Sequence, residues 1–286
     1  MAPSPKKRAS AGSARKKKKA PLRTAKTALK SPSKAKPPVF HPTLLVYPTP
    51  EILVQEAAHQ VMQAAREAAD QRGRFVAALS GGTTPKGLFQ QLSEEPYRSL
   101  VPWDKTFLFW VDERHVPLDQ ETSNYRMTRE HLLSKVPIPS ENVFPATDGS
   151  RPVEQAASAY EIKLRKFFGG SAVPRFDFTL MGMGDDGHTA SLFPGAPQVE
   201  ESEKWVVGYF VDPSKKERVS LTFPVLNASR FLMVLVEGGK KAAMLKEVLE
   251  GPSDPPRYPV QRLRPRDGRL LFEVDAAAAG TLRKGR

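Results

Sequence analysis

The alternation of short apolar runs with amphipathic segments constrains the fold of this 286-residue chain more than any other feature. Apolar runs that predict buried strands lie at Phe75–Leu79, Phe107–Val111, Phe176–Met181, Val206–Val211, Val219–Phe223, Phe231–Val236 and Leu270–Val274. Helical patterns fall between many of them, at Glu51–Gln71, Pro85–Leu92, Asn124–Leu133, Val153–Phe168 and Lys240–Leu249. Strands that alternate with helices predict an α/β fold with a mainly parallel, Rossmann-like sheet covered by helices on both faces.

The first segment after a predicted strand is rich in glycine and hydroxyl side chains. In open parallel sheets, ligands bind beyond the carboxyl ends of the strands. Glycines let backbone N–H groups approach a ligand, and Pro85 suits the first position of the next helix, whose N-terminus attracts anions. The ending of a Walker loop is absent, and an ordinary tight turn is the alternative. The residues that we predict to bind a phosphate monoester are Ser80, Gly81, Gly82, Thr83 and Thr84.

Charged side chains follow the strand predicted at Phe107–Val111. Asp112-Glu113-Arg114 comes first, and Ser123-Asn124-Tyr125-Arg126 then opens a helical segment. Arg114 offers a forked, permanently charged group that fits a phosphate. The two acids could orient that guanidinium, bind sugar hydroxyls or act as a base. A run of this kind is usually a solvated turn, so only its place at a strand end favours a functional interpretation.

The most informative segment runs from Met181 through Gly182-Met183-Gly184-Asp185-Asp186-Gly187-His188 to Pro194. It matches the dinucleotide pattern G-x-G-x-x-G, but Asp185 and Asp186 would stand where a pyrophosphate must approach, so we reject that interpretation. A His beside a carboxylate suits acid–base chemistry near neutral pH. A lone His in a loop is usually structural, and here the neighbouring glycines and acids favour a catalytic role. No Gly-x-Ser-x-Gly elbow accompanies it, which argues against a serine hydrolase.

Composition excludes several classes of protein. Hydrophobic residues make up 40% of the chain and charged residues 26%, as in globular proteins. The absence of cysteine excludes disulfides, thiolate catalysis and cysteine-type zinc sites. No apolar run approaches the roughly 20 residues that span a bilayer, so we expect no membrane partner. We also expect neither a metal nor a cofactor, because no metal-ligand spacing is found at the other histidines, His41, His59, His115 and His131.

The positive charge of the chain is concentrated at one end. The formal net charge is +13, but residues 1–38 hold 13 Lys and Arg and no acid, which leaves 31 basic residues to balance 31 acidic ones in residues 39–286. We expect a disordered basic tail at 1–38 and one catalytic domain at 39–286. Three interpretations of the tail stay open: a solvated appendage with weak polyanion binding, a nuclear signal at Lys6–Arg8 and Arg15–Lys19, or an organelle transit peptide. A cytoplasmic location is the default expectation.

Taken together, the three strand-end segments resemble the 6-phosphogluconolactonase family over roughly residues 44–275. The block from Gly182 to Pro194 carries the resemblance most specifically, and Arg218-Val219-Ser220-Leu221-Thr222 and Gly238-Gly239-Lys240-Lys241-Ala242 support it. The family shares its fold with glucosamine-6-phosphate isomerases/deaminases. Those enzymes carry a Glu five residues after the His and typically Asp-Glu-Tyr at the second strand end. Phe193 and Arg114 occupy these positions here, which favours the lactonase.

The resemblance implies hydrolysis of 6-phospho-D-glucono-1,5-lactone in the pentose phosphate pathway. The oligomeric state stays open between a monomer and a small homo-oligomer. His188 is expected to act as the general base on water and Asp186 to orient it. Asp112, a third catalytic candidate, is expected with Asn124 to hold sugar hydroxyls. The phosphate is expected at Ser80–Thr84, with Arg114 and one late lysine, for which the family pattern favours Lys241 over Lys240. The alternatives are a deaminase-type sugar-phosphate enzyme, or a non-catalytic protein that binds sugar phosphates, or nucleic acid through the basic tail.

Overall fold

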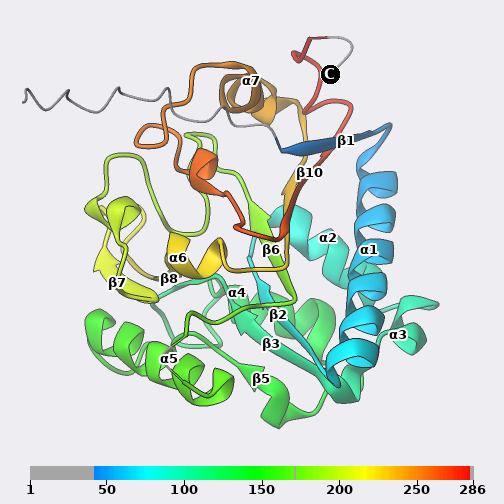
Figure 1. The fold of residues 1–286 in the computed structure, drawn as a ribbon, viewed down its shortest axis with the longest axis vertical. Coiled ribbons are helices and arrows are strands. Elements are labelled where there is room, and N and C mark those ends of the chain that lie inside the picture. Colours follow the sequence, from blue (N-terminus) through cyan, green and yellow to red (C-terminus); the bar gives the residue numbers. More distant parts are fainter. Residues whose placement is uncertain (1–41, 171, 284–286) are drawn as a thin grey trace, which may run out of the picture. The chain divides into compact units, whose positions relative to one another are not determined.

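The computed structural model describes residues 42–170 and 172–283 (Figure 1). The chain divides into two compact units, Met1–Pro37 and Pro38–Arg286, and the described residues belong to the second. The predicted disordered tail lies outside the described residues. Within those residues, no helix is long and apolar enough to cross a membrane.

A seven-stranded parallel sheet forms the centre of the second unit. Its spatial order is β1-β10-β9-β6-β2-β3-β5, and every neighbouring pair runs parallel. The predicted α/β fold with a mainly parallel sheet is confirmed. The strands are β1 Thr43–Tyr47, β2 Phe75–Leu79, β3 Thr106–Trp110, β5 Val143–Phe144, β6 Phe178–Gly182, β9 Phe231–Val236 and β10 Arg269–Asp275.

Three further strands form a separate antiparallel sheet, in the order β4-β8-β7. They are β4 Asp112–Arg114, β7 Val206–Phe210 and β8 Glu217–Leu221. The sequence pattern did not separate these strands from the parallel sheet. The short connection between β7 and β8 has no room for a crossover helix, so the two strands pair antiparallel. β4 follows β3 almost directly and joins this second sheet, which makes the acidic and basic residues at the second strand end part of a strand.

The helices are α1 Pro50–Arg72, α2 Thr83–Leu92, α3 Tyr97–Leu100, α4 Asn124–Thr128, α5 Val153–Phe168, α6 Phe223–Leu226 and α7 Ala242–Glu250. A π-helical turn at Arg129–Leu133 extends α4, and a 3-10 turn at Gly239–Lys241 precedes α7. Pro85 was predicted to start a helix, which is wrong by two residues. The N–H of Lys86 already bonds the carbonyl of Gly82, so α2 begins at Thr83.

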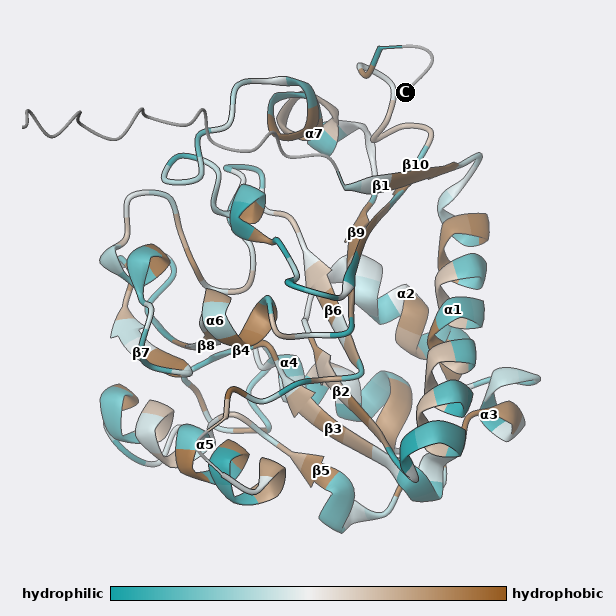
Figure 2. Cartoon of the chain, in the orientation of Figure 1, coloured by the Kyte–Doolittle hydropathy of each residue, from teal (hydrophilic) through white to brown (hydrophobic). Residues whose placement is uncertain are grey.

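Alternating side chains on the parallel strands pack into two separate hydrophobic cores, one on each face of the sheet. Phe75, Ala77 and Leu79 of β2 pack with α1, α2 and α3, whereas Val76 and Ala78 pack with α5, α7 and the small sheet. Figure 2 shows the brown strands enclosed between helices whose outer faces are teal. The sheet is therefore buried on both faces, as a parallel sheet requires.

One carboxyl group lies in the core beneath α1. Glu273 of β10 has no exposed surface and accepts a hydrogen bond from Gln60 of α1, while its Oε2 has no partner among the described residues. Burial raises the pKa of this carboxyl group to about 7, and the nearby charge of Glu56 acts in the same direction against the hydrogen bond from Gln60. Its ionisation therefore weakens the folded state as the pH rises.

Strand order brings the predicted functional segments together. Strands β9, β6, β2 and β3 are consecutive neighbours. Their carboxyl ends are followed, in that order, by the Gly238–Ala242 segment, the histidine loop, the Gly-rich turn and the Asp112–Arg114 segment. The chain order reverses between β2 and β6, since β3 lies on one side of β2 and β6 on the other. Ligands bind at such a switch point in open α/β sheets. The fold therefore places the Gly-rich turn and the histidine loop beside each other.

Candidate active site

The loop after β6 holds His188 against a carboxylate. Oδ1 of Asp186 lies 2.5 Å from Nδ1 of His188 and also accepts the backbone N–H of His188 at 3.0 Å. This bond fixes the proton on Nδ1, which leaves Nε2 as the basic nitrogen. Among the described residues, no protein atom hydrogen-bonds Nε2, and the His188 side chain is 28% exposed. The imidazole can therefore meet a water or substrate through Nε2.

The charge on Asp186 is stabilised by this contact. Partial burial alone would raise the pKa of the carboxyl group, but the hydrogen bond and the charge of His188 outweigh it and lower the pKa to about 2. Asp186 is therefore ionised throughout the physiological range. A permanent carboxylate next to the ring stabilises the imidazolium that forms when Nε2 takes a proton.

The close packing of this pair depends on Gly184. A Cβ atom at this position would lie 2.0 Å from Nδ1 of His188 and 2.8 Å from Oδ1 of Asp186. The N–H of Gly184 also bonds the carbonyl of His188 at 2.9 Å. Glycine is thus required here by the approach of the two side chains, whereas a Cβ at Gly182 would meet nothing within 4 Å.

The small antiparallel sheet anchors the far end of the histidine loop. Oγ of Ser191 donates to Oδ2 of the buried Asp112 at 2.7 Å. The hydroxyl of Tyr209 on β7 donates to the carbonyl of Ser191 at 2.7 Å. In this structure, Asp112 therefore contacts the loop that carries His188. Its predicted role toward sugar hydroxyls stays a prediction.

A buried carboxylate at Glu113 organises the start of α4. Its two oxygens accept the backbone N–H groups of Arg114, Asn124 and Tyr125 at 2.7–2.8 Å, and the hydroxyl of Ser123 at 3.1 Å. Burial raises the pKa of Glu113 to about 7, against the lowering effect of these backbone hydrogen bonds. Both of its oxygens accept hydrogen bonds from protein groups, so Glu113 shapes the site by holding these backbone segments.

The predicted phosphate loop packs directly against this region. A Cβ at Gly81 would lie 1.9 Å from Oδ1 of Asn124, so only glycine allows the two segments to touch. Nδ2 of Asn124 donates to the carbonyl of Asp112 at 2.9 Å. Both ends of the amide thus lie against protein atoms, and its predicted contact with sugar hydroxyls stays a prediction.

Free hydrogen-bonding groups gather where the phosphate was predicted. Thr83 and Thr84 are the first two residues of α2, where backbone N–H groups have no partner within the helix, and Gly82 precedes them as the N-cap. Oγ of Ser80 is buried and has no hydrogen-bond partner among the described residues. A helix N-terminus beside an unsatisfied hydroxyl is suited to an anion.

Two cations that were predicted to bind the phosphate lie on other elements, Arg114 on β4 and Lys241 in the turn before α7. Nη1 of Arg114 donates to the carbonyl of Thr122 at 2.6 Å, which holds the guanidinium next to β4. Nζ of Lys241 lies 2.6 Å from Oδ1 of Asp185, in the histidine loop. Lys240 is exposed. The structure thus places Lys241 against the histidine loop, and its contact with the phosphate stays a prediction.

An aromatic ring borders the histidine. The rings of Phe193 and His188 have centroids 4.4 Å apart at an angle of 42°, and Phe193 is buried. A cavity of about 550 Å³ lies beside them and is lined in part by Asp186, Phe193, Tyr209 and Lys215. No group of three His, Cys, Asp or Glu side chains that could hold a metal ion occurs within the described ranges. The expectation of metal-free chemistry stays a prediction.

Comparison with known proteins identifies the family. Residues 48–272 match the model of the glucosamine-6-phosphate isomerases/6-phosphogluconolactonase family. The chain belongs to this family. The match covers all of the segments that form the candidate site, so the predicted resemblance is confirmed.

The relatives and solved structures most often carry the lactonase name. The chain is 40% identical over 243 residues to the 6-phosphogluconolactonase of Rattus norvegicus, covering 83% of this chain and 92% of the relative. It is 39% identical over 250 residues to a probable chloroplastic 6-phosphogluconolactonase 3 of Oryza sativa, covering 84% and 76%. The solved structure of 6-phosphogluconolactonase from Trypanosoma brucei has 30% identity and a TM-score of 0.76, covering 85% of this chain and all of that one. A monomeric glucosamine-6-phosphate deaminase, 19% identical with a TM-score of 0.71, shares the fold.

Sequence reasoning missed the members of the site that act through other residues. It considered Glu113 but gave it no place in the site, and it did not single out Ser191 or Tyr209. An acid in a strand-end motif followed ten residues later by Ser-Asn at a helix start is a signal for a buried capping carboxylate. No comparable signal marks Tyr209, because its partner is a backbone carbonyl.

Proposed function

We propose that this family member hydrolyses 6-phospho-D-glucono-1,5-lactone to 6-phospho-D-gluconate. The observation that carries the proposal is the Asp186–His188 pair with its free Nε2, bordered by the ring of Phe193 instead of a second acid. The names of the rat and Trypanosoma brucei relatives support the same substrate. Lactone hydrolysis needs one group that removes a proton from water and later donates it to the departing ring oxygen, and His188 can do both.

In the proposed mechanism, Nε2 of His188 removes a proton from a water molecule as its oxygen attacks the lactone carbonyl carbon. The tetrahedral intermediate collapses with cleavage of the bond between that carbon and the ring oxygen. The imidazolium then donates its proton to the departing ring oxygen, which becomes the hydroxyl group of the product. Asp186 holds Nδ1–H throughout and stabilises the imidazolium, so the base is regenerated in each cycle.

The phosphate of the substrate is placed by the groups that have no partner in the protein. We assign it to Ser80–Thr84 at the start of α2, where free N–H groups and the helix dipole favour an anion. Arg114 and Lys241 supply the opposing charge. Binding at Lys241 exchanges its contact with Asp185 for one with the phosphate. Asp112 and Asn124 position the histidine loop and the phosphate loop, and their sugar contacts are part of the same proposal.

The deaminase alternative is disfavoured by the residue beside the imidazole. A ring-opening isomerase needs a further acid near the histidine, and Phe193 is apolar and buried there. We infer that the pocket wall formed by Phe193 serves water-dependent cleavage of a lactone and offers no proton donor for sugar isomerisation.

The catalytic unit is proposed to be residues 39–286, acting without a cofactor. The rice relative is named chloroplastic, and the rat name gives no location. The cytoplasmic location and the oligomeric state stay predictions, and the proposed address or polyanion-binding role of residues 1–38 concerns residues outside the described structure.

The test is a pair of assays on the purified full chain. Lactone hydrolysis is followed by coupling 6-phosphogluconate to its dehydrogenase, with subtraction of the spontaneous ring opening. Deamination of glucosamine 6-phosphate is measured in parallel. We expect hydrolysis well above the spontaneous rate and no deamination. Deamination without lactone hydrolysis would overturn the proposal.

A further inference from the structure

Strand register places two arginines directly opposite each other at the candidate site. In the antiparallel pair of β4 and β8, Arg114 faces Arg218, and Asp112 faces Ser220. Side chains two residues apart on a strand share one face of the sheet. Arg114, Arg218 and Asp112 therefore lie on the same face, and this is the face that Ser191 of the histidine loop contacts through Asp112.

The row of register partners that begins with Arg114 and Arg218 continues onto β7, the third strand of the small sheet. Arg218 is also the register partner of Tyr209 on β7, whose hydroxyl bonds the carbonyl of Ser191. Arg218 is thus flanked by Arg114 on one side and by a residue that anchors the histidine loop on the other. On the side of β4, Asn124 contacts both Asp112 and Gly81. The arginine pair therefore lies in the wall that joins the phosphate loop to the histidine loop.

Neither arginine has a salt-bridge partner in the described part of the chain. The side-chain hydrogen bonds go to carbonyl groups, from Arg114 to Thr122 at 2.6 Å and from Arg218 to Glu217 at 3.2 Å. The nearby acids are already occupied, because Asp112 accepts from Ser191 and Glu113 accepts backbone N–H groups. Within the described residues, two guanidinium groups thus face each other without an ion pair of their own, and the more distant charges of Asp112 and Glu113 oppose their repulsion.

This arrangement is unfavourable without an added anion. Like charges directly opposite each other on paired strands destabilise the pair. Arg218 is also half-buried, and burial, followed by the positive charge of Arg114, lowers the pKa of its guanidinium against the opposing charges of Asp112 and Glu113. An exposed arginine could turn into solvent, but a half-buried one keeps its charge close to Arg114. A divalent anion between the two would remove the repulsion.

We propose that Arg218 and Arg114 form a two-guanidinium clamp for the phosphate dianion of the substrate, opposite the N-terminus of α2. This inference rests on the proposed function and adds a specificity-determining residue to it. Guanidinium groups bind phosphate oxygens through paired, planar N–H donors, so two of them match the two charges of a phosphate monoester. The clamp makes the enzyme select phosphorylated lactones over unphosphorylated ones.

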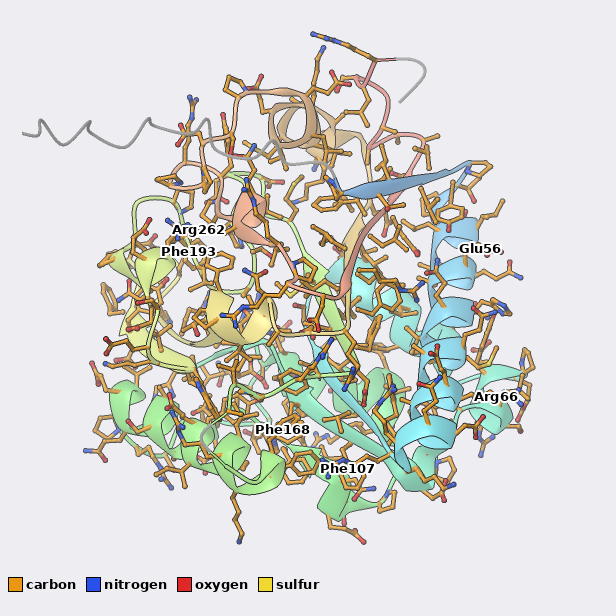
Figure 3. All side chains as sticks on the ribbon, viewed as in Figure 1. Glu56, Arg66, Phe107, Phe168, Phe193 and Arg262 are labelled. Carbon is orange, nitrogen blue, oxygen red and sulfur yellow. The ribbon has the colours of Figure 1, made fainter. Side chains whose placement is uncertain are left out.

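The test compares two substrates in four proteins. Full-length wild type, Arg218→Gln, Arg218→Lys and the control Arg66→Gln are assayed on 6-phospho-D-glucono-1,5-lactone and on D-glucono-1,5-lactone, which lacks the phosphate. Arg66 is exposed on α1, across the molecule from Phe193 (Figure 3), so its replacement removes the same charge away from the site. Thermal unfolding of each variant checks the fold.

We expect Arg218→Gln to lower kcat/KM for the phosphorylated lactone by roughly 10- to 100-fold, because it removes hydrogen bonds to a charged group. The rate on the unphosphorylated lactone stays within about twofold, since that substrate makes no phosphate contact. Arg218→Lys keeps the charge but loses the fork, so its loss is intermediate. Arg66→Gln matches wild type on both substrates.

A direct binding measurement separates this proposal from the activity. Titration of wild type with inorganic phosphate, followed by NMR or calorimetry, gives an affinity that falls in Arg218→Gln and is unchanged in Arg66→Gln. If the wild type shows no lactone hydrolysis but phosphate binding still depends on Arg218, the proposed function fails and the clamp stands. Equal losses on both lactones, or phosphate affinity that is unchanged in both Arg218 variants, would overturn the clamp.

Discussion

Replacement of Asp186 by Asn and by Ala should have clearly different effects on catalysis. In the structure, one carboxylate oxygen, Oδ1, accepts both Nδ1–H and the backbone N–H of His188. An Asn side chain has one oxygen, and the backbone N–H of His188 requires an acceptor at that place. The amide oxygen is thereby held next to Nδ1, so Asp186→Asn keeps the productive tautomer and loses only the charge.

The size of the effect follows from the electrostatics. The pKa of Asp186 is lowered from 3.8 to about 2, and each pKa unit corresponds to about 1.36 kcal/mol of interaction energy. Because the side chain is 45% exposed, solvent screens part of this energy and leaves ~1 kcal/mol. Asp186→Asn should therefore lower kcat/KM by roughly fivefold. Asp186→Ala removes the acceptor as well and frees the imidazole to rotate, and a misplaced base costs on the order of 10²-fold.

The assay is steady-state lactone hydrolysis at several substrate concentrations, with spontaneous opening subtracted and thermal unfolding as the control for folding. The effect is expected mainly in kcat, because the pair does not contact the phosphate. A loss in Asp186→Asn as large as that in Asp186→Ala would refute the argument that the backbone N–H fixes the amide. Wild-type rates in both would show that Asp186 does not support the base.

Two further perturbations test the local packing and the pH dependence of stability. Gly184→Ala should lower kcat by at least about 10²-fold because its Cβ would displace His188. The matched control Gly182→Ala has open space and should retain activity in the same lactonase assay. Glu273 has a folded-state pKa of about 7, above its usual 4.5, so its stabilising contribution is complete below pH 4.5 and is lost as the pH rises through 7. Glu273→Gln should therefore flatten the fall in melting temperature between pH 5 and pH 8 by several degrees, a change that scanning calorimetry would detect and whose absence would contradict the assignment.

Most of the parallel sheet could be predicted from the sequence because its strands are buried on both faces. Phe75–Leu79 and Phe231–Val236 are continuous apolar runs, and both predictions agree with β2 and β9. The edge strand β1, Thr43–Tyr47, was missed although Pro42 and Pro48 flank it, because its side chains are exposed or only half-buried. Strands that tertiary packing buries have continuous apolar sequences, so these were the strands that could be predicted.

The candidate site divides in a similar way. Asp186 and His188 are only two positions apart in the sequence, so their contact could be expected from the motif. The contact of Asp112 with Ser191 joins residues 79 positions apart and depends on β4 leaving the parallel sheet. Likewise, Arg218 becomes a neighbour of Arg114 only through the register of an antiparallel pair that the sequence did not reveal. Local chemistry was predictable, whereas partners brought together by topology were not.

The central claim is that His188 is the base for lactone hydrolysis. The most direct measurement is the rate of 6-phospho-D-glucono-1,5-lactone hydrolysis by wild type and by His188→Ala, each corrected for spontaneous opening. The contribution of a positioned general base predicts a fall of roughly 10²- to 10⁴-fold in kcat with little change in the melting temperature. Turnover by a folded His188→Ala protein at the wild-type rate would contradict the account.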